Sequence, residues 1–205
     1  FTGSSNSNSN STAGKSDGGK NSSKTDELSL SQIASKVVPL MRQGRPIPFS
    51  LLRAEFPPET ATDKNLFVAL GSCAVMVRGN WCINSKLLGY SPPMTQARTF
   101  LMCLFQSMRV VHKARLLRVF AKDENHYNDG NDDDDDNKDN DGSVTPEVID
   151  FLLEQLGQLT SEGWVLKVTD DVKFLQLFPQ PTMVHLQYWV KQIELFRPMF
   201  ERYRS

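Results

Sequence analysis

The chain carries its most informative pattern in Cys73-Ala-Val-Met-Val-Arg-Gly-Asn-Trp-Cys-Ile83. Two runs of β-forming residues flank the pair Gly79-Asn80, and a Gly-Asn pair between such runs predicts a β-hairpin with a two-residue turn. In this register Arg78 lies opposite Trp81. We therefore expect a short hairpin with a tryptophan at the start of its second strand.

The same register assigns the hairpin side chains to two faces, because successive residues of a strand point to opposite sides. Met76 pairs with Ile83 on one face, whereas Val77 and Cys82 share the other. The register thus predicts which of these side chains have the same neighbours.

The residues before the hairpin predict three helices and a short strand. The first helix begins at the capping box Ser29-Leu-Ser-Gln32 and ends by Gly44, with Pro39 inside it as a break or kink. The elements that follow are an edge strand at 45–49 and helices at 50–56 and 62–70, the last closed by Gly71. Helix, strand, helix, helix and hairpin is the order of a winged helix.

The same order of elements follows a second time. The second set comprises a helix at 94–108, an extended piece at 109–111, a helix at 113–120, a helix that begins at Thr145-Pro146, and a hairpin at 159–168. In the helix after Thr145, the apolar spacing places Val148, Phe151, Leu152 and Leu156 inward.

Two short matches between these sets indicate a duplication. Leu51-Leu-Arg53 and Leu116-Leu-Arg118 lie 65 residues apart, and Trp81 and Trp164 lie 83 apart. The second offset exceeds the first by 18, about the length of the acidic run at 123–141 that interrupts the second set. The simplest account is a tandem duplication with one insertion.

We therefore predict a mainly α fold with small β-hairpins (α+β), built of tandem winged-helix units. The predicted parts are a disordered Ser/Asn/Gly-rich tail at 1–27, winged-helix units at 28–90 and 94–178, a disordered acidic insertion at 123–141 in the second unit, and an amphipathic helix at 182–203. The predicted structural motif comprises Gly79, Asn80, Trp81, Gly163 and Trp164.

The C-terminal helix carries one apolar stripe, and a stripe of this kind must pack on something. The stripe consists of Met183, Leu186, Trp189, Val190, Ile193, Phe196 and Phe200. Such a helix usually covers its own domain, so the second unit is the preferred neighbour. A partner protein is the alternative.

The charge of the chain is unevenly distributed. Residues 123–141 hold ten acids against one Lys, a net charge of −9, so the remaining residues sum to +8 in a chain whose total is −1. Residues 1–26 hold a single large apolar side chain, Phe1, so neither segment can bury a core. The basic remainder permits an anionic partner. The acidic run itself is best explained as a solvated insertion, with mimicry of nucleic acid as a second hypothesis.

The sequence contains no pattern typical of catalysis, cofactor binding or a metal site. Gly14-Lys15-Ser16 lacks the earlier glycine of a phosphate-binding loop, and neither glycine of the acidic region gives a calcium-loop register. Three cysteines without C-x-x-C spacing are typical of buried thiols in a reducing compartment. No run of 18 apolar residues predicts a membrane span. Because it begins with Phe, we expect the chain to be a piece of something longer.

The helix at 113–120 has opposing basic and apolar faces. Counted at 100° per residue from Lys113, which opens the helix as a fourth cation, Arg115, Arg118 and Lys122 point away from the leucines and other apolar residues of the same helix. These cations, with Arg78 and Lys86 of the first hairpin region, are the candidate contacts to a nucleic-acid backbone or a partner. A solvated helix face is the slightly preferred alternative.

Base-specific reading has weaker support. The third helix of a winged helix usually enters the groove, yet 62–70 offers only Lys64 and Asn65, and 145–158 offers no cation. A winged helix of this kind is more often a protein-docking module. The alternative function is a DNA-binding transcription regulator that contacts phosphates through the basic face at 113–122.

An ordered set of short motifs resembles a known family. The set runs from Leu70-Gly-Ser-Cys-Ala-Val-Met-Val-Arg-Gly-Asn-Trp81 and Asn84-Ser-Lys-Leu-Leu-Gly-Tyr90 through Ala97-Arg-Thr-Phe100, Phe105-Gln-Ser107, Val110-Val-His-Lys113 and Glu154-Gln-Leu156 to Glu162-Gly-Trp164. It resembles the winged-helix region of the fifth specific subunit of eukaryotic RNA polymerase III, over about residues 45 to 200.

The resemblance implies a non-catalytic polymerase subunit that resides in the nucleus. It implies pairing with another polymerase III subunit in a heterodimer similar to TFIIF, which helps initiation and termination. In the family, however, the dimerisation barrel lies upstream of the winged helices, whereas a Ser/Asn-rich segment precedes them here. Pairing is therefore not assigned to these residues, and the acidic insertion departs from the family pattern.

Overall fold

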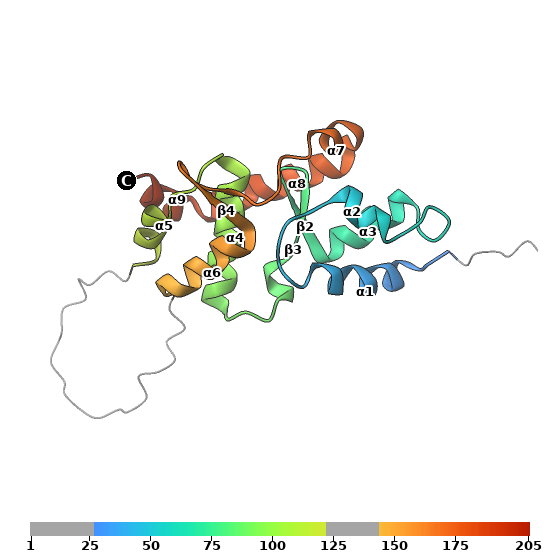
Figure 1. The fold of residues 1–205 in the computed structure, drawn as a ribbon, viewed down its shortest axis with the longest axis horizontal. Helices are drawn as coiled ribbons and strands as arrows, with labels where there is room; N and C mark the ends of the chain where they lie inside the picture. Colours follow the sequence, from blue (N-terminus) through green and yellow to red (C-terminus); the bar gives the residue numbers. More distant parts are fainter. Residues whose placement is uncertain (1–26, 122–143) are drawn as a thin grey trace, which may run out of the picture.

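The structure, a computed structural model, describes residues 27–121 and 144–205 (Figure 1). The described residues are mainly helical with two small antiparallel sheets, which confirms the predicted fold class. The predicted tail up to residue 26 and the acidic insertion at 123–141 lie outside the described residues.

The first set of elements ends in a three-stranded sheet of order β1-β3-β2. Its members are α1 (Leu30–Met41), β1 (Ile47–Pro48), α2 (Phe49–Ala54), α3 (Asp63–Cys73), β2 (Ala74–Val77) and β3 (Asn80–Ile83), followed by the 3-10 turn η1 (Ser85–Leu87). The helix α3 runs through Gly71, where the sequence predicted its end.

The second set repeats this order. Its members are α4 (Pro92–Ser107), α5 (Lys113–Phe120), α6 (Pro146–Leu156), β4 (Gly157–Thr160) and β5 (Gly163–Leu166). In the first set β1 pairs with the second hairpin strand at Ile47 and Trp81, and in the second set Val111 forms a bridge with Trp164. The two tryptophans therefore hold equivalent places in the pairing, as a duplication requires.

Local capping explains where the helices begin. Ser29 and Gln32 form the predicted capping box at α1, and the Thr145 side chain accepts a hydrogen bond from the Val148 N–H at the start of α6. Pro146 follows Thr145 at a position where its missing N–H costs nothing. Pro39 lies inside α1 near its end.

The turn of the first hairpin differs from the prediction. Val77 pairs with Asn80 and Met76 with Trp81, so the turn residues are Arg78 and Gly79, with φ of 50° and 83°. Two positive φ angles are the geometry of a type I′ turn. Met76 therefore pairs with Trp81 and not with Ile83, a shift of two residues along β3. Because side chains alternate between faces, a shift of two leaves each side chain on the face that the sequence predicted.

The first hairpin is buried on both faces. Ala74, Met76, Trp81 and Ile83 belong to one hydrophobic core with α1, α2 and α3. Val75, Val77 and Cys82 belong to a second core with α4, α5 and α6. The β2–β3 hairpin is therefore a wall shared by two cores. By contrast, β4 is mostly exposed, and Trp164 is half-buried where Trp81 is fully buried.

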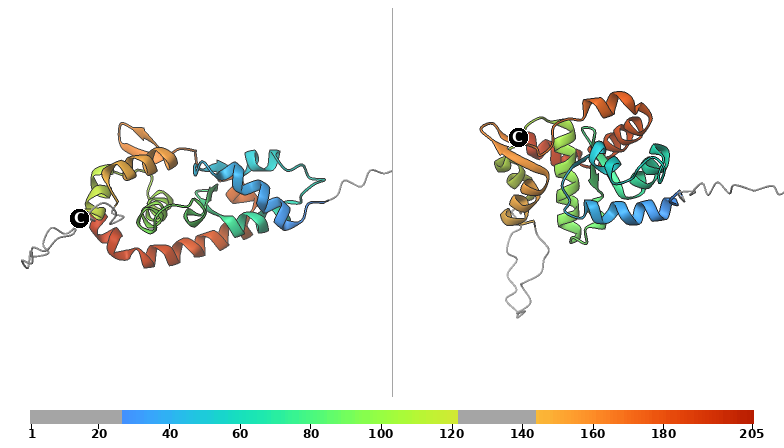
Figure 2. Two further views of the ribbon diagram at one scale, coloured as in Figure 1. Left: turned by 90° about the horizontal axis from the view of Figure 1, so that it is seen from below. Right: turned by 45° about the vertical axis from the view of Figure 1, so that its right-hand side comes forward.

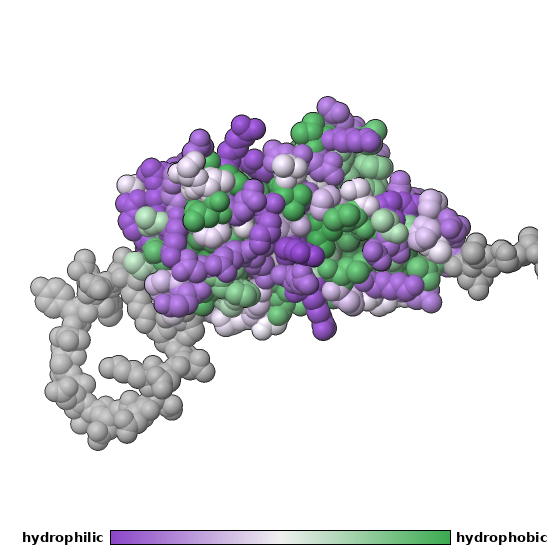
Figure 3. All heavy atoms as spheres, viewed as in Figure 1, coloured by the Kyte–Doolittle hydropathy of each residue, from purple (hydrophilic) through white to green (hydrophobic). Residues whose placement is uncertain are grey.

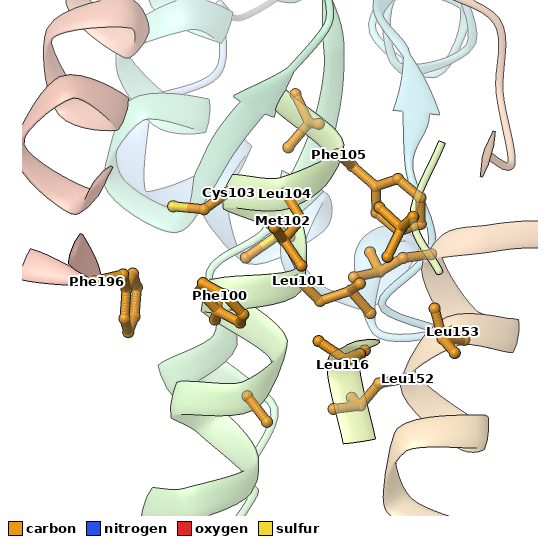
Figure 4. Packing of buried hydrophobic residues seen from close by; sticks show 14 of the residues in the cluster. Phe100, Leu101, Met102, Cys103, Leu104, Phe105, Leu116, Leu152, Leu153 and Phe196 are labelled. Carbon is orange, nitrogen blue, oxygen red and sulfur yellow. The ribbon is translucent and has the colours of Figure 1, made fainter. Parts of the chain in front are cut away.

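The second core is built around α4. Figure 4 shows Phe100 and Leu101 on different sides of this helix, with Phe100 on the side of Phe196 and Leu101 on the side of Leu116 and Leu152. The Phe100 and Phe196 ring centroids lie 5.5 Å apart in an edge-to-face arrangement. In α6, Ile149 and Leu153 are buried and Phe151 is 48% exposed, so the predicted inward position of Phe151 is wrong.

The C-terminal residues form three helices that join the two cores. They are α7 (Val172–Leu177), α8 (Pro179–Leu195) and α9 (Arg197–Arg204). Figure 2 shows α8 running along one side of both units. The predicted helix at 182–203 is interrupted at Phe196, because Pro198 in the first turn of α9 has no N–H to continue α8.

These helices do not belong to the second core alone. Phe174 of α7, in the segment assigned by sequence to the second unit, packs in the first core against Phe49 and Trp81. The α8 residue Trp189 packs in the second core and donates its indole N–H to the Met76 carbonyl of the shared hairpin.

The predicted apolar stripe of this region is therefore half covered. Trp189, Phe196 and Phe200 are buried, whereas Met183, Leu186, Val190 and Ile193 are exposed.

A buried arginine ties the two units together. Arg98 of α4 is fully buried, and its guanidinium donates to the Gly44 and Ile83 carbonyls at 2.6 and 2.9 Å. It also donates to the Gln155 side-chain oxygen of α6 at 2.8 Å. Burial lowers the pKa of Arg98. Its hydrogen bonds thus join α1's end, the hairpin's end, α4 and α6.

We expect Arg98→Met to destabilise the chain strongly. The substitution leaves the Gly44 and Ile83 carbonyls without their donor, and each buried unsatisfied group costs about 1–3 kcal/mol. The free energy of unfolding from urea titration should fall by about 3 kcal/mol or more. Arg115→Met, at an exposed arginine, is the control, and equal values for the two variants would contradict the role of Arg98.

Candidate partner and nucleic-acid interface

The predicted contact Arg78 is engaged within the protein. Its Nε donates to the Phe105 carbonyl at 2.5 Å, and its guanidinium forms an ion pair with Asp170 at 3.3 Å. The side chain is 16% exposed. Arg78 therefore closes the turn against α4 and the segment before α7, which leaves little of its charge for a phosphate.

The rest of the predicted hairpin motif is also covered. A Cβ at Gly79 would lie 2.7 Å from the Asp171 carbonyl, and the Asn80 amide donates to the Thr169 carbonyl at 2.9 Å. The segment 169–171 thus packs over the turn. Lys86, in η1, is exposed. In the second hairpin, Gly163 opens β5 next to Trp164.

The helix α5 has the predicted two faces. Leu116 and Val119 are buried, and Arg115 and Arg118 are exposed. Lys113 lies at the edge and forms an ion pair with Asp150 of α6 at 2.6 Å. Lys122 lies outside the described residues. Of the predicted cations on this helix, the structure leaves Arg115 and Arg118 without an ion pair among the described residues.

A second helix lies beside the basic face. The helix α9 packs on α5, and the Tyr203 hydroxyl of α9 accepts a hydrogen bond from the His112 N–H at 2.8 Å. Burial raises the pKa of Tyr203, so it stays protonated at neutral pH. The last turn of α9 carries Arg202 and Arg204. Sequence reasoning missed this neighbour, because the pairing of α5 with α9 joins residues about 90 apart.

The third helix of each set presents few cations. The outward residues of α3 include Lys64, Val68 and Gly71, and those of α6 include Glu147 and Glu154. Base-edge contacts in the major groove come mostly from Arg, Lys, Asn and Gln. Neither helix therefore carries a set of side chains suited to reading bases.

The described residues offer neither a metal-ligating cluster nor a reactive cysteine. Within 27–121 and 144–205, no group of three or more His, Cys, Asp or Glu could hold a metal ion. The three cysteines are buried and unpaired, and burial raises the pKa of Cys82 and Cys103 to about 12. Their thiols are thus poor nucleophiles at neutral pH. None of the described helices has the length and apolar character needed to span a membrane.

Comparison with known families agrees with the resemblance seen in the sequence. A family described as RPC5 protein matches residues 2–129, more than half of the chain. The chain belongs to the RPC5 family. A search of curated proteins finds no match.

Membership in this family assigns the chain to RNA polymerase III. The family is that of RNA polymerase III subunit C5, so the predicted recognition is confirmed. RPC5 is an accessory subunit family involved in transcription. The matched residues include α1 to α5 and the shared hairpin, which places the most specific sequence motif inside the family region.

His185 of α8 gives the junction with the shared hairpin a pH dependence. Its Nδ1 accepts a hydrogen bond from the Met76 N–H at 3.4 Å, and burial lowers its pKa to about 4. Between about pH 6.5 and pH 4 the unfolded chain binds a proton at this residue that the folded chain does not. Stability from this residue is therefore complete above pH 6.5 and is lost as the pH falls.

We expect the free energy of unfolding to drop by about 2 kcal/mol through this residue between pH 7 and pH 4.5. His185→Gln keeps a hydrogen-bond acceptor for the Met76 N–H but cannot titrate, so its drop over the same range should be smaller by that amount. Urea titrations at the two pH values measure the difference. Identical drops in the two proteins would show that His185 titrates normally.

Proposed function

We propose that the chain is a docking or scaffold subunit of RNA polymerase III, in a TFIIF-like subcomplex that supports initiation and termination in the nucleus. It has no catalytic role in this proposal. Its partners are other polymerase III subunits, including the heterodimer partner. Family membership supports this function, and so does the arrangement of the two repeated sets of elements.

We interpret the two sets as winged helices whose usual DNA contacts are occupied. The first hairpin corresponds to a wing, yet both of its faces are buried and Arg78 at its turn is paired with Asp170. This burial of the first hairpin is the observation that carries the proposal. A wing enclosed in this way supports a rigid two-unit body, and such a body suits docking better than insertion into a DNA groove.

Assembly with the polymerase tests the proposal. Tagged full chain, incubated with nuclear extract treated with nuclease, should recover RNA polymerase III subunits at physiological salt. Nuclease treatment removes tethering through DNA, so recovery reports a protein contact. Arg98→Met is a matched control, because it should loosen the two-unit body and reduce recovery. Failure of the natural chain to recover any polymerase III subunit would contradict the proposal.

A weak contact to a nucleic-acid backbone is the second candidate. Arg115 and Arg118 favour such a contact, because both are exposed and neither forms an ion pair with a described residue. Two phosphate contacts on duplex DNA predict that log K falls with log salt at a slope of about −2.

We expect Arg115→Ala/Arg118→Ala to remove this binding, and Lys113→Ala, whose lysine pairs with Asp150, to change it little. Fluorescence anisotropy with duplexes of different sequence measures both effects. Discrimination between sequences by several kcal/mol would instead favour a DNA-binding regulator.

A further inference from the structure

An apolar groove lies between α3 and the junction of α7 and α8. Its volume is about 690 Å³. One wall is formed by Phe67, Val68 and Gly71 of α3, and the other by Leu177, Pro181 and Val184. Figure 2 shows the start of α8 beside α3 in both views, and Figure 3 shows apolar side chains on the outer surface of α7. We call this feature the α3–α8 groove.

The walls of this groove leave large apolar side chains in solvent. Val68, Leu177 and Val184 are 52%, 61% and 63% exposed. Each lies on an element whose other side packs in a core, and each lines the groove. Several exposed apolar residues gathered in one concave site indicate a place where another molecule is bound.

Gly71 adds an independent indication. It lies within α3, where glycine is less favourable than alanine because it loses more backbone freedom on folding. Nothing within 4 Å would meet a Cβ at this position. The chain itself therefore gives no steric reason for this glycine. Its missing side chain leaves room for close approach by a bound segment.

Three side chains of the groove lining offer hydrogen-bond donors. Trp81 lines it, and its buried indole N–H has no hydrogen-bond partner in the described structure. His185 lines it as well, with its Nδ1 used by the Met76 N–H, so the neutral ring carries its proton on Nε2. Lys64 is the charged residue of the lining. An occupant should therefore bring acceptors, with negative charge near Lys64.

The segments of this chain outside the described residues have the wrong composition for this site. Residues 1–26 carry Phe1 as their one large apolar side chain, and residues 123–141 carry no aliphatic one. Nucleic acid would meet apolar walls and a single cation, which does not suit a polyanion. The remaining class of occupant is a protein segment with aliphatic and acidic side chains.

We propose that the α3–α8 groove binds a short segment of another RNA polymerase III subunit, with aliphatic side chains between Val68 and Val184 and an acidic residue opposite Lys64. The backbone of this segment passes over Gly71. This inference rests on the proposed docking function and names its surface. The contact is apolar at its centre and charged at one end, which fixes the direction of the bound segment.

A matched pair of variants on α8 tests the site. Val184→Lys places a charge in the groove, and Val190→Lys places the same charge at a valine of similar exposure outside it. The probe is purified RNA polymerase III that lacks this subunit, titrated with the labelled full chain. We expect Val184→Lys to weaken binding at least tenfold and Val190→Lys to change it less than twofold. Equal effects of the two variants, or no effect of Val184→Lys, would contradict the proposal that the groove is a binding site.

Gly71→Ala separates binding from folding. The alanine should raise the unfolding midpoint, because it favours the helix, and yet weaken binding to the polymerase because its Cβ enters the groove. Lys64→Glu should weaken binding as well, by reversing the charge. A more stable Gly71→Ala chain with unchanged affinity would contradict close approach at this position.

A photo-crosslinking residue at position 184 identifies the occupant after assembly. The expected product joins this chain to a peptide of another polymerase subunit that contains aliphatic residues next to Asp or Glu. Crosslinks to a second copy of this chain, to its own residues 1–26 or 123–141, or to nucleic acid would each overturn the proposal.

The binding titration distinguishes failure of the docking function from failure of the groove. If the natural chain does not bind the polymerase at all, the proposed docking function is wrong. If the natural chain and Val184→Lys bind equally well, the docking function stands and only the proposed binding site in the groove is wrong.

Discussion

Burial of the β2–β3 hairpin on both faces is the constraint that organises this molecule. A short hairpin has little stability in water by itself, and here each of its faces completes a different hydrophobic core. Neither core is finished without it. The Arg98 hydrogen bonds and the Trp189 bond to the Met76 carbonyl reinforce the same junction from α4 and α8. The two repeated units are therefore joined through the β2–β3 hairpin, which also holds the most specific sequence motif of the family region.

This junction supports the proposed docking role for a fold with the element order of a winged helix. The hairpin that would reach along DNA is enclosed, and its turn arginine is bound to Asp170 and the Phe105 carbonyl. What remains outside includes the α3–α8 groove and the arginines of α5. Membership in the RPC5 family, an accessory subunit family, agrees with this proposal.

The sequence predicted what depends on local rules. The caps at Ser29 and Thr145 and the two faces of α5 follow from spacing within a few residues, and the order of elements is the sum of such local patterns. The turn was misplaced because Arg78 adopts a positive φ that a Gly-Asn rule does not anticipate, held by contacts to α4 and Asp170. Phe151 was misplaced because two overlapping apolar stripes run along α6, and packing on α4 selects the one with Ile149 and Leu153. The Arg98 network and the groove were out of reach, since their residues come from segments far apart in the chain.

Amide hydrogen exchange, followed residue by residue, tests the shared wall most directly. The second hairpin provides an internal reference, because β4 and β5 have the same length as β2 and β3 but are less buried, with β4 mostly exposed and β5 mostly half-buried. The account predicts that amides of residues 74–83 exchange only when the whole chain unfolds, with an opening free energy equal to that of α4, whereas those of 157–166 exchange through smaller local openings. Equal and rapid exchange in the two hairpins would contradict a first hairpin held between two cores.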